Sequence, residues 1–403
     1  MTLDPNQDPA PLALVAPVRT PIGKFGGALA SLTAADLGTA AARACLGRAG
    51  LDGDRVDQAI FGHGRQAGGG PNTARQIAHR AGLPDDRPAF TVNQACGSGL
   101  QSVFAAARAI RLGEARVVLA GGTESMSNTP YMLPRARWGH RLGSDAVVDG
   151  MYRDGFDDPI SGLVMGETAE ELAEDYGIDR AASDGWAAGS QNRCEAARAA
   201  GRFDSEIAAV TVPGRRGDVV VEADEHPRDG IRPEKLAKLP AVFRDGGRVS
   251  AGNASGITDG AASVLVMSQE TAAELGAPVA GLLHGWEVVG VEPRIMGIGP
   301  VPAVRRLLER YGLDHGAIDQ VELNEAFACQ VLACLADLPF DPERVNPDGG
   351  AIALGHPIGC TGTRILVTLL HGLAHRRGRW GVATLCISGG MGMAALVERV
   401  GES

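Results

Sequence analysis

The chain has 403 residues, of which 44% are apolar, 21% charged and only 4% aromatic, and its formal net charge is −10. Because nucleic-acid binding depends on basic side chains that neutralise phosphate, this charge and the lack of a long basic run in the sequence argue against a DNA or RNA partner. No apolar stretch approaches the roughly 20 residues that would cross a bilayer, which argues against membrane insertion.

The N-terminus and the cysteines predict a cytoplasmic protein with reduced thiols. Residues 1–11 carry Asp4 and Asp8 and lack a basic segment followed by an apolar one, so no secretory signal is visible. The seven cysteines are odd in number and include no Cys-x-x-Cys pair, which argues against a disulfide framework or a zinc ribbon. His371 and His375 lie one helical turn apart without a third ligand, so we interpret them as a solvated helix face rather than a metal site.

Apolar runs typical of strands alternate with alanine-rich helical patterns at both ends of the chain, which predicts an α/β fold with helices on both faces of the sheet. In the first third we expect strands at 12–18, 58–62, 90–93 and 116–120, and helices at 34–49, 73–81 and 98–112. In the last third we expect strands at 261–267, 320–323 and 381–387, a further strand through Val397, and helices at 302–311, from Ala326, and at 361–376.

The middle of the chain differs from both ends. Between residues 123 and 248, proline, glycine, arginine and aspartate are frequent, and the helical patterns 168–176 and 183–201 lie between irregular stretches. A long insertion of this kind is usually functional, so we expect a lid or a binding lobe. Because both halves present a cysteine near the end of an apolar strand, the sequence also favours a duplicated fold.

The strongest candidate for chemistry is Cys96, in the segment 92–100 (VNQACGSGL). We expect a sharp turn from strand to helix at this cysteine, with the glycines after it allowing unusual backbone angles. The free N–H groups and partial positive charge of the helix start favour a thiolate, which is the nucleophilic form of the side chain. A small buried cysteine against a helix start is the alternative, and the Gly-Ser-Gly context favours the nucleophile.

A second candidate is His356, in the segment 349–359 (GGAIALGHPIG). A histidine between glycine and proline does not fit a regular helix or strand, so we expect a fixed loop position. From there the imidazole could accept a thiol proton or donate to an oxyanion. The alternative is a turn at the surface, but the apolar and glycine neighbours of His356 favour a buried position.

Two further segments carry candidates whose local patterns are ambiguous. Cys386, in 386–392 (CISGGMG), follows a predicted strand and would lie beside free backbone donors, although an inert core cysteine fits the pattern equally well. Asn324, in 324–328 (NEAFA), follows another strand. It could be a helix N-cap, or its amide could position a water or donate to a developing negative charge.

Taken together, these four segments resemble the thiolase family, in particular its acetyl-CoA acetyltransferase and 3-ketoacyl-CoA thiolase group. The resemblance extends over nearly the whole chain. It includes the segments 19–27 (RTPIGKFGG), 121–127 (GGTESMS), 251–256 (AGNASG) and 259–262 (DGAA).

The resemblance implies a duplicated α/β fold with a five-layered αβαβα core and an inserted loop domain. Residues 1–126, completed by 251–276, would form the N-terminal half that carries the nucleophilic cysteine. Residues 127–250 would form the loop domain for coenzyme A binding and oligomerisation, and residues 277–403 the C-terminal half.

The resemblance also implies a ping-pong acyl transfer between acyl-CoA thioesters, or thiolytic cleavage of a 3-oxoacyl-CoA, with no metal and no cofactor beyond these substrates. Cys96 would take the acyl group, His356 would accept the proton of Cys96, and Cys386 would remove an α-proton from the second acyl-CoA. One oxyanion site would use His356 and a water held by Asn324. The other would use the backbone N–H groups of Cys96 and Ser388.

Contacts with coenzyme A and with other subunits are implied in the same way. Arg228 would meet the nucleotide end, and the pantetheine and acyl channel would be lined by Ser255, Met165, Phe243 and Phe327. The segment 130–143, with its three arginines, resembles a loop that joins dimers, so a homodimer or homotetramer is expected.

Some positions depart from the family pattern. Ser388 stands where glycine is common, so its N–H serves only if its φ angle is tolerated. Val164 stands where acetoacetyl-specific members often have histidine, which argues against a strictly short-chain substrate. Cys360 is assigned no role, and the segment 62–68 (GHGRQAG) lacks the spacing of a dinucleotide-binding loop.

Two other functions are alternatives to a thiolase. A decarboxylating condensing enzyme of the ketoacyl synthase type shares the duplicated fold and a nucleophilic cysteine, but pairs it with two histidines or with histidine and asparagine, so Cys386 argues against it. A thiolase-like lipid carrier without catalysis would be expected to lose one of the four chemical residues, and all four are present.

Overall fold

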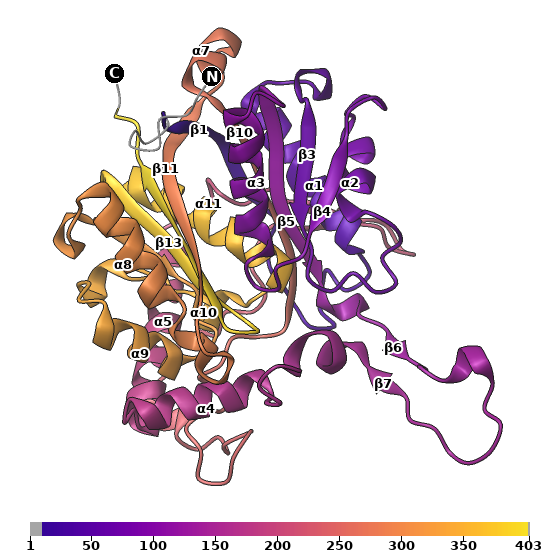
Figure 1. The fold of residues 1–403 in the computed structure, drawn as a ribbon, viewed down its shortest axis with the longest axis vertical. Helices are drawn as coiled ribbons and strands as arrows, with labels where there is room; N and C mark the ends of the chain where they lie inside the picture. The colour runs from indigo at the N-terminus through magenta and orange to yellow at the C-terminus, as the bar shows by residue number, and fades with distance from the viewer. Residues whose placement is uncertain (1–9, 402–403) are drawn as a thin grey trace.

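One mixed sheet runs through the molecule, and the computed structural model describes residues 10–401 (Figure 1). Its ten strands are β1 (Leu12–Arg19), β2 (Gly23–Lys24), β3 (Gln58–Gly62), β4 (Ala89–Val92), β5 (Val117–Ser125), β10 (Thr258–Ser268), β11 (Val279–Gly290), β12 (Gln320–Leu323), β13 (Trp380–Ile387) and β14 (Met391–Glu398). Along the sheet they follow the order β12–β13–β14–β11–β1–β10–β5–β3–β4, and β2 pairs with β10.

The strand order shows the duplication. Outward from β1, β10 is antiparallel to β1 and β5 is antiparallel to β10. Beyond them, β3 is parallel to β5 and β4 is parallel to β3. Outward from β11, the strands β14 and β13 are antiparallel, β12 is parallel to β13, and a parallel bridge joins Val321 to Val345. The two halves therefore repeat one pattern, and the antiparallel pair of β1 and β11 joins them edge to edge.

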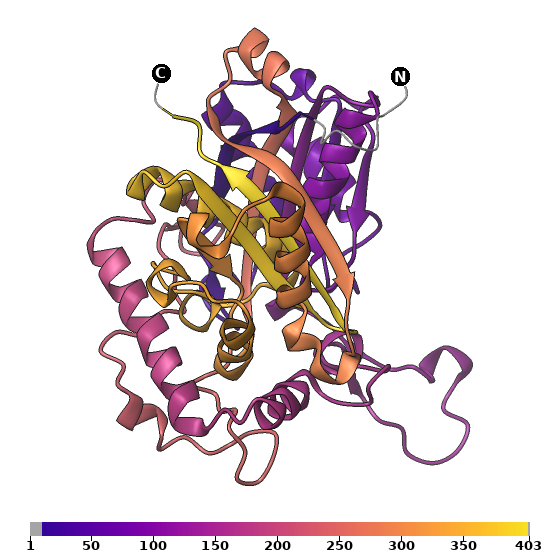
Figure 2. The ribbon, with the colours of Figure 1, turned by 60° about the vertical axis from the view of Figure 1, so that its left-hand side comes forward.

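The helices form three layers around the two halves of the sheet, which gives the expected αβαβα arrangement (Figure 2). The outer layers contain α1 and α2 on the first half and α8 and α9 on the second, and α3 packs against α11 in the central layer. Their bounds are α1 (Ala34–Ala49), α2 (Thr73–Ala81), α3 (Ser98–Arg111), α8 (Pro300–Tyr311), α9 (Ala328–Asp337) and α11 (Ile358–Arg376).

Three buried clusters hold these layers together. The largest surrounds Phe104 of α3 and Leu366 of α11 and includes residues of both sheet halves. A second lies between the first half and its outer helices, and a third between the second half and its outer helices. Burial of apolar side chains is the main stabilising contribution to folding. These three clusters consist mostly of aliphatic residues, so a chain with few aromatic residues still has a large core.

The insertion between β5 and β10 wraps around one end of this core (Figures 1 and 2). The segment that carries β6 and β7 extends away from the body, whereas α5 packs against α9 and α10. The elements of the insertion are β6 (Tyr131–Met132), β7 (Val148–Asp149), α4 (Met165–Asp175), α5 (Arg180–Ala199), β8 (Val210–Val212), β9 (Val219–Val221) and α6 (Pro233–Leu236), and α10 (Ala351–Leu354) follows later in the chain.

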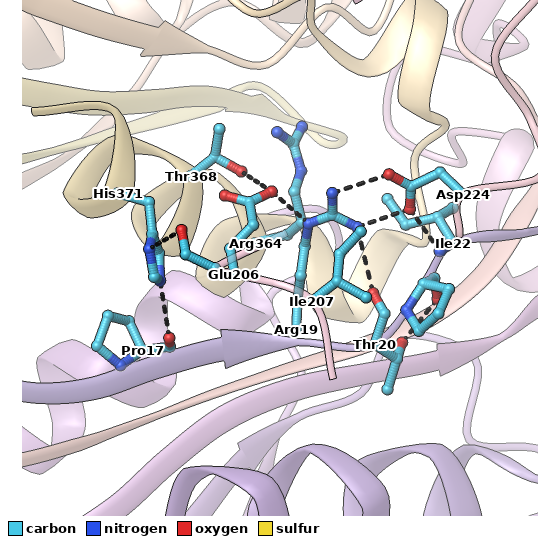
Figure 3. A network of polar contacts seen from close by, with 12 residues as sticks. Pro17, Arg19, Thr20, Ile22, Glu206, Ile207, Asp224, Arg364, Thr368 and His371 are labelled. Carbon is cyan, nitrogen blue, oxygen red and sulfur yellow. Dashed lines mark hydrogen bonds and ion pairs between the residues drawn. The ribbon is translucent and has the colours of Figure 1, made fainter. Parts of the chain in front are cut away.

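A buried arginine at the end of β1 anchors the insertion (Figure 3). The guanidinium of Arg19 donates to Glu206 at 2.6 Å and to both oxygens of Asp224 at 2.6 and 2.8 Å. Asp224 also accepts the backbone N–H of Ile22 at 2.8 Å. Although burial opposes charge, the charges and hydrogen bonds of the two carboxylates raise the pKa of Arg19 above its ordinary value, so the group stays ionised.

The same region corrects one interpretation of the sequence. His371 does not lie on a solvated face: its Nε2 is 3.0 Å from the carbonyl of Pro17, and its Nδ1 is 3.0 Å from the hydroxyl of Ser205 (Figure 3). This histidine therefore connects α11 to β1 and to the insertion. Within residues 10–401, no cluster of three or more metal-ligating side chains is found.

Most expected elements are present with boundaries within a few residues, but two longer elements and several short ones were not expected. No strand or helix was expected between residues 268 and 301, where the structure contains β11 and α7 (Gln269–Leu275). β11 contains Gly281, Gly285 and His284, which weaken a strand signal, and it is stable here because it pairs with both β1 and β14. Within the described residues, no helix is long and apolar enough to cross a membrane.

Candidate active site

Three of the four chemical candidates line one cavity. Cys96 comes from the start of α3, His356 from the loop before α11, and Cys386 from the end of β13. The cavity has a volume of about 210 Å³, and its lining is mostly apolar. Ser388, which follows Cys386 in the turn between β13 and β14, also lines it. The sequence motifs that are far apart along the chain therefore meet.

Glycines bring the two central helices together at their N-terminal ends. A Cβ atom at Gly99 would lie 2.8 Å from the backbone nitrogen of Thr363, and one at Gly362 would lie 2.3 Å from that of Leu100. Such contacts are too short for any side chain, so only glycine allows this approach. The close crossing places the loop of Cys96 beside that of His356.

The backbone at Cys96 is tightly turned, but the strained residue is not the one expected. Gly97 has an ordinary φ of −79°, whereas Ala95 has a φ of +46°, a conformation rare for residues with a side chain. The side chain of Asn93 supports this turn by accepting the N–H of Ala95 at 3.0 Å. Gly97 is needed for space instead, because a Cβ there would lie 2.5 Å from Met393.

The environment of Cys96 favours a neutral thiol in the absence of substrate. Burial raises its pKa, and the charge of Arg65 and the backbone N–H groups of Ser388 and of Cys96 itself lower it only in part. The sequence suggests that the helix start favours a thiolate. In the structure the helix start does not produce a thiolate by itself. A base must take the proton, and the two N–H groups would stabilise negative charge near this sulfur.

The hydrogen bonds of His356 determine which of its nitrogens is free. The hydroxyl of Thr361 donates to the carbonyl of Pro357 at 2.9 Å, so it accepts the Nδ1–H of His356 at 2.6 Å. The Nε2 atom is buried and has no hydrogen-bond partner among the described residues. Burial and the charges of Arg364 and Arg65 lower the pKa of His356 to about 3. The imidazole is therefore neutral, with an unprotonated Nε2.

Cys386 is a second protonated thiol in the same cavity. It is 1% exposed, and its pKa is raised well above the ordinary value by burial and then by the charge of Cys96. Both cysteines line the same cavity. Ser388 does not adopt a positive φ, because Gly389 and Gly390 make the turn with φ values of +84° and +83°. A serine is therefore tolerated at this position.

Asn324 is not a helix N-cap. α9 begins only at Ala328, and the backbone N–H of Asn324 donates to Thr384 at 3.0 Å, as in a continued strand. Both polar atoms of its side chain are buried without a hydrogen-bond partner among the described residues. Asn324 does not itself line the cavity, whereas Ala326 does. A buried amide without a hydrogen-bond partner lowers the stability of a protein. The side chain of Asn324 is therefore suited to hold a water or an atom of a ligand.

Four of the five expected substrate contacts lie in the cavity, and one does not. Arg228 is exposed at the surface outside it, where its backbone N–H donates to Gln191 at 2.9 Å. The side chains that do line the cavity are Ser255, Met165, Phe243 and Phe327. They belong to one side of the site, since Phe327 packs in one cluster with Met165 and Cys386 and in another with Phe243.

The structure also adds residues that the sequence analysis gives no role, although Met126 and Ile358 lie within the segments 121–127 and 349–359. Met126, Tyr152, Phe156 and Ile358 form another side of the cavity, and Arg65 lies among them. For Arg65 the sequence signal was its position: it follows a strand that ends at the same edge as the Cys96 loop, where side chains of parallel strands meet.

A buried carboxylate supports this part of the site. Glu124 accepts the backbone N–H groups of Gly64 and Arg65 at 3.1 Å and that of Gly359 at 2.8 Å, and it lies 3.2 Å from Nε2 of His63. Burial alone would raise the pKa of Glu124, but the hydrogen bond of His63 and the charges of His63 and Arg65 lower it. Glu124 therefore joins the loop after β3 to the start of α11.

Comparisons with known proteins agree with this geometry. A family model described as the N-terminal domain of thiolase matches residues 12–270, and one described as the C-terminal domain matches residues 277–399. An acetyl-CoA acetyltransferase of Pseudomonas aeruginosa is 49% identical over 389 residues, which is 96% of this chain and 99% of that protein. A probable acetyl-CoA acetyltransferase of Escherichia coli is 46% identical over 388 residues, or 96% of this chain and 99% of that protein.

Two solved structures are similar over nearly their whole length. The acetyl-CoA acetyltransferase of Bacillus anthracis has a TM-score of 0.95 and 44% identity, covering 97% of this chain and 99% of that one. Human mitochondrial 3-ketoacyl-CoA thiolase in complex with CoA has a TM-score of 0.93 and 41% identity, covering 97% and 98%. With its duplicated fold and two thiols in one cavity, the chain belongs to the thiolase family.

Proposed function

We propose that this chain transfers acyl groups between coenzyme A thioesters by a ping-pong mechanism, condensing two acyl-CoA molecules or cleaving a 3-oxoacyl-CoA with coenzyme A. The observation that carries the proposal is the meeting of two neutral thiols and one neutral imidazole in a single, largely apolar cavity. Acyl transfer needs one nucleophile and one α-proton base, and two thiols supply both.

In the first half-reaction, Cys96 attacks the carbonyl carbon of the thioester and its proton moves to Nε2 of His356. The unprotonated Nε2 is the acceptor that this step requires. When the tetrahedral intermediate collapses, the carbon–sulfur bond to coenzyme A breaks and His356 returns the proton to the departing thiolate. The products are an acyl-cysteine and free coenzyme A.

In the second half-reaction, the proton of Cys386 would first move to Nε2 of His356, and the resulting thiolate would remove an α-proton from a second acyl-CoA. The carbanion would then attack the acyl carbon on Cys96, and the departing Cys96 thiolate would take the proton from His356. The enolate oxygen would be stabilised by His356 and by a water held by Asn324. The oxyanion of the tetrahedral intermediate would be stabilised by the N–H groups of Cys96 and Ser388. An α-proton of a thioester is weakly acidic, so donors of this kind contribute on the order of 3 kcal/mol each.

The proposal extends to the substrate contacts, the domains and the assembly. The cavity side with Phe243 and Phe327 would hold pantetheine, and the exposed Arg228 would meet the nucleotide end. Residues 127–250 would act as the loop domain, inserted into a half formed by 1–126 and 251–276, with 277–403 as the other half.

The assembly proposal rests on one exposed segment. The extended part of the insertion exposes several large apolar side chains, as a subunit contact would, and we propose a homodimer or homotetramer. These side chains are Tyr131, Leu133, Trp138, Leu142 and Val147. All seven cysteines are free thiols, which supports the cytoplasm as the compartment.

The test is thiolysis by the purified protein. Acetoacetyl-CoA and longer 3-oxoacyl-CoA thioesters are mixed with free coenzyme A, and loss of the 3-oxoacyl absorbance is followed. Turnover is expected for at least one chain length. Failure at every length would favour a non-catalytic lipid carrier. Decarboxylation of malonyl-CoA, which a thiolase does not need, would favour a condensing enzyme of the ketoacyl synthase type.

A further inference from the structure

The cavity contains a buried positive charge that the proposed mechanism does not use. Arg65 lines the cavity with 5% of its surface exposed, and its Nε and Nη2 atoms have no hydrogen-bond partner among the described residues. An arginine remains protonated in a protein, so this side chain cannot escape the cost of burial by becoming neutral. A buried cation without a close partner is destabilising, so the site calls for a compensating anion.

The protein itself offers little compensation. Glu124, whose pKa is lowered in part by the charge of Arg65, already accepts three backbone N–H groups and contacts His63, and it makes no hydrogen bond with Nε or Nη2 of the guanidinium. The guanidinium instead lies over the ring of Phe156, with its central carbon 5.6 Å from the ring centre. A Cβ at Gly155 would lie only 1.6 Å from Nη2, so this glycine makes room for the arginine.

The location of Arg65 indicates which part of a substrate would reach it. Phe156 belongs to the same apolar cluster as Cys96, Met126 and Ile358, whereas Phe327 and Cys386 belong to another cluster. The charge of Arg65 acts on Cys96 and on His356. An acyl group attached to Cys96 would therefore extend among Met126, Phe156 and Arg65, away from the side proposed for pantetheine.

We propose that Arg65 binds a carboxylate at the far end of the acyl chain, so that the preferred substrates are 3-oxoacyl-CoA thioesters of dicarboxylic acids. This inference rests on the proposed function and adds a substrate class to it. A guanidinium forms two parallel hydrogen bonds with a carboxylate, and the rest of this side of the cavity suits methylene groups. A neutral chain of the same length would leave the cation unpaired, which is how a buried polar site rejects an apolar analogue.

The experiment compares matched substrates at two lengths. Thiolysis is measured with 3-oxohexanoyl-CoA and 3-oxohexanedioyl-CoA, and with 3-oxooctanoyl-CoA and 3-oxooctanedioyl-CoA. The wild-type protein is expected to have a kcat/KM at least about tenfold higher for the carboxylated member of one pair or both. Equal or lower kcat/KM for the carboxylated member at both lengths would overturn the proposal.

Variants separate substrate recognition from a general effect on the nucleophile. In Arg65→Leu the ratio of the two kcat/KM values should fall at least about tenfold, and Arg65→Lys should retain part of the preference. Arg108→Leu is the matched control, because Arg108 also lies over an aromatic ring, that of Trp286 at 5.2 Å, but is exposed on α3 and outside the cavity. Its ratio should equal that of the wild type.

Two outcomes would assign Arg65 a different role. If Arg65→Leu lowers both kcat/KM values by the same factor, the guanidinium serves only Cys96, and if it raises the KM for coenzyme A equally with every substrate, it serves a coenzyme A phosphate. Either result contradicts the proposal. Turnover of neutral substrates alone would leave the proposed thiolase function intact, whereas no turnover of any substrate, together with no acetylation of Cys96 by acetyl-CoA, would contradict that function itself.

Discussion

The hydroxyl of Thr361 accepts the Nδ1–H of His356 at 2.6 Å while donating its own proton to Pro357, and this pair of bonds leaves Nε2 of His356 as the free acceptor in the cavity. A residue outside the cavity lining thus determines the tautomer of the proposed base. The residue acts by positioning, as the orienting partners of catalytic histidines generally do.

Removing this hydroxyl should impair catalysis more than it affects substrate binding. In Thr361→Val the buried Nδ1–H loses its acceptor and the imidazole can adopt the other tautomer, so kcat should fall roughly 10- to 100-fold with little change in KM. Steady-state thiolysis kinetics measure both constants. Thr361→Ser, which keeps a hydroxyl, should restore most of kcat, and an equal loss in both variants would assign Thr361 a packing role.

The two thiols should be separable by acyl labelling. Cys96→Ala should abolish covalent labelling by acetyl-CoA, because the nucleophile is absent, whereas Cys386→Ala should still become labelled but should neither condense nor cleave. Intact-protein mass spectrometry after incubation with acetyl-CoA measures the added acetyl group. Cys360→Ala is the control, since Cys360 is buried outside the cavity and should label and turn over like the wild type. Equal labelling of the Cys96 variant would contradict the assignment.

The amide of Asn324 should matter for rate and not for folding. Its polar atoms have no partner among the described residues, so Asn324→Ala should change the free energy of unfolding by about 1 kcal/mol or less while lowering kcat roughly 100-fold. Urea denaturation and thiolysis rates test the two parts. Asn346→Ala is the contrasting control: its amide bonds to the backbone of Leu323 and to Glu325, so stability should fall by about 1–3 kcal/mol.

The neutral state of His356 predicts a pH dependence of stability. Its pKa is lowered to about 3 in the folded protein, against about 6.5 in an unfolded chain. Between these values only the unfolded chain binds the proton, so this residue's contribution to stability is complete above about pH 6.5 and decreases as the pH falls, by up to about 1.4 kcal/mol per pH unit.

This contribution is measured by urea denaturation at about pH 7 and about pH 5.5 in the wild type and in His356→Asn. The wild type should lose about 1.3 kcal/mol more than the variant on acidification, because the variant has no proton to bind at this position. Equal losses in the two proteins would show that the imidazole of the folded protein already titrates near its ordinary pKa.

The anchor of the insertion should be a large contributor to stability. In Arg19→Met the carboxylates of Glu206 and Asp224, both nearly fully buried, would lose their cation, so unfolding should become easier by about 3–5 kcal/mol. Thermal denaturation measures the change. Arg116→Met, which breaks an exposed ion pair with Glu274, should cost no more than about 1 kcal/mol. Similar losses in the two variants would show that the buried network contributes little.

Local sequence identified the elements that local chemistry controls. Helices such as α1 carry their own start and stop signals: a capping box at Thr33 and a left-handed Gly50 bound residues Ala34–Ala49, as expected from the pattern. Cys96 and His356 were recognisable for the same reason, since glycine and proline around them restrict the backbone whatever surrounds it. β11 was missed because its stability comes from the strands on either side of it.

The chemical state of each candidate depended on neighbours that are distant in sequence. The start of α3 suggested a thiolate at Cys96, but burial among residues distant in sequence keeps the thiol neutral. Asn324 looked like a helix cap until the structure placed the helix later. Arg65 carried no motif, and its significance comes from the residues that enclose it. Ionisation and hydrogen bonding are properties of a surrounding environment, and here that environment is assembled only when the two halves pack together.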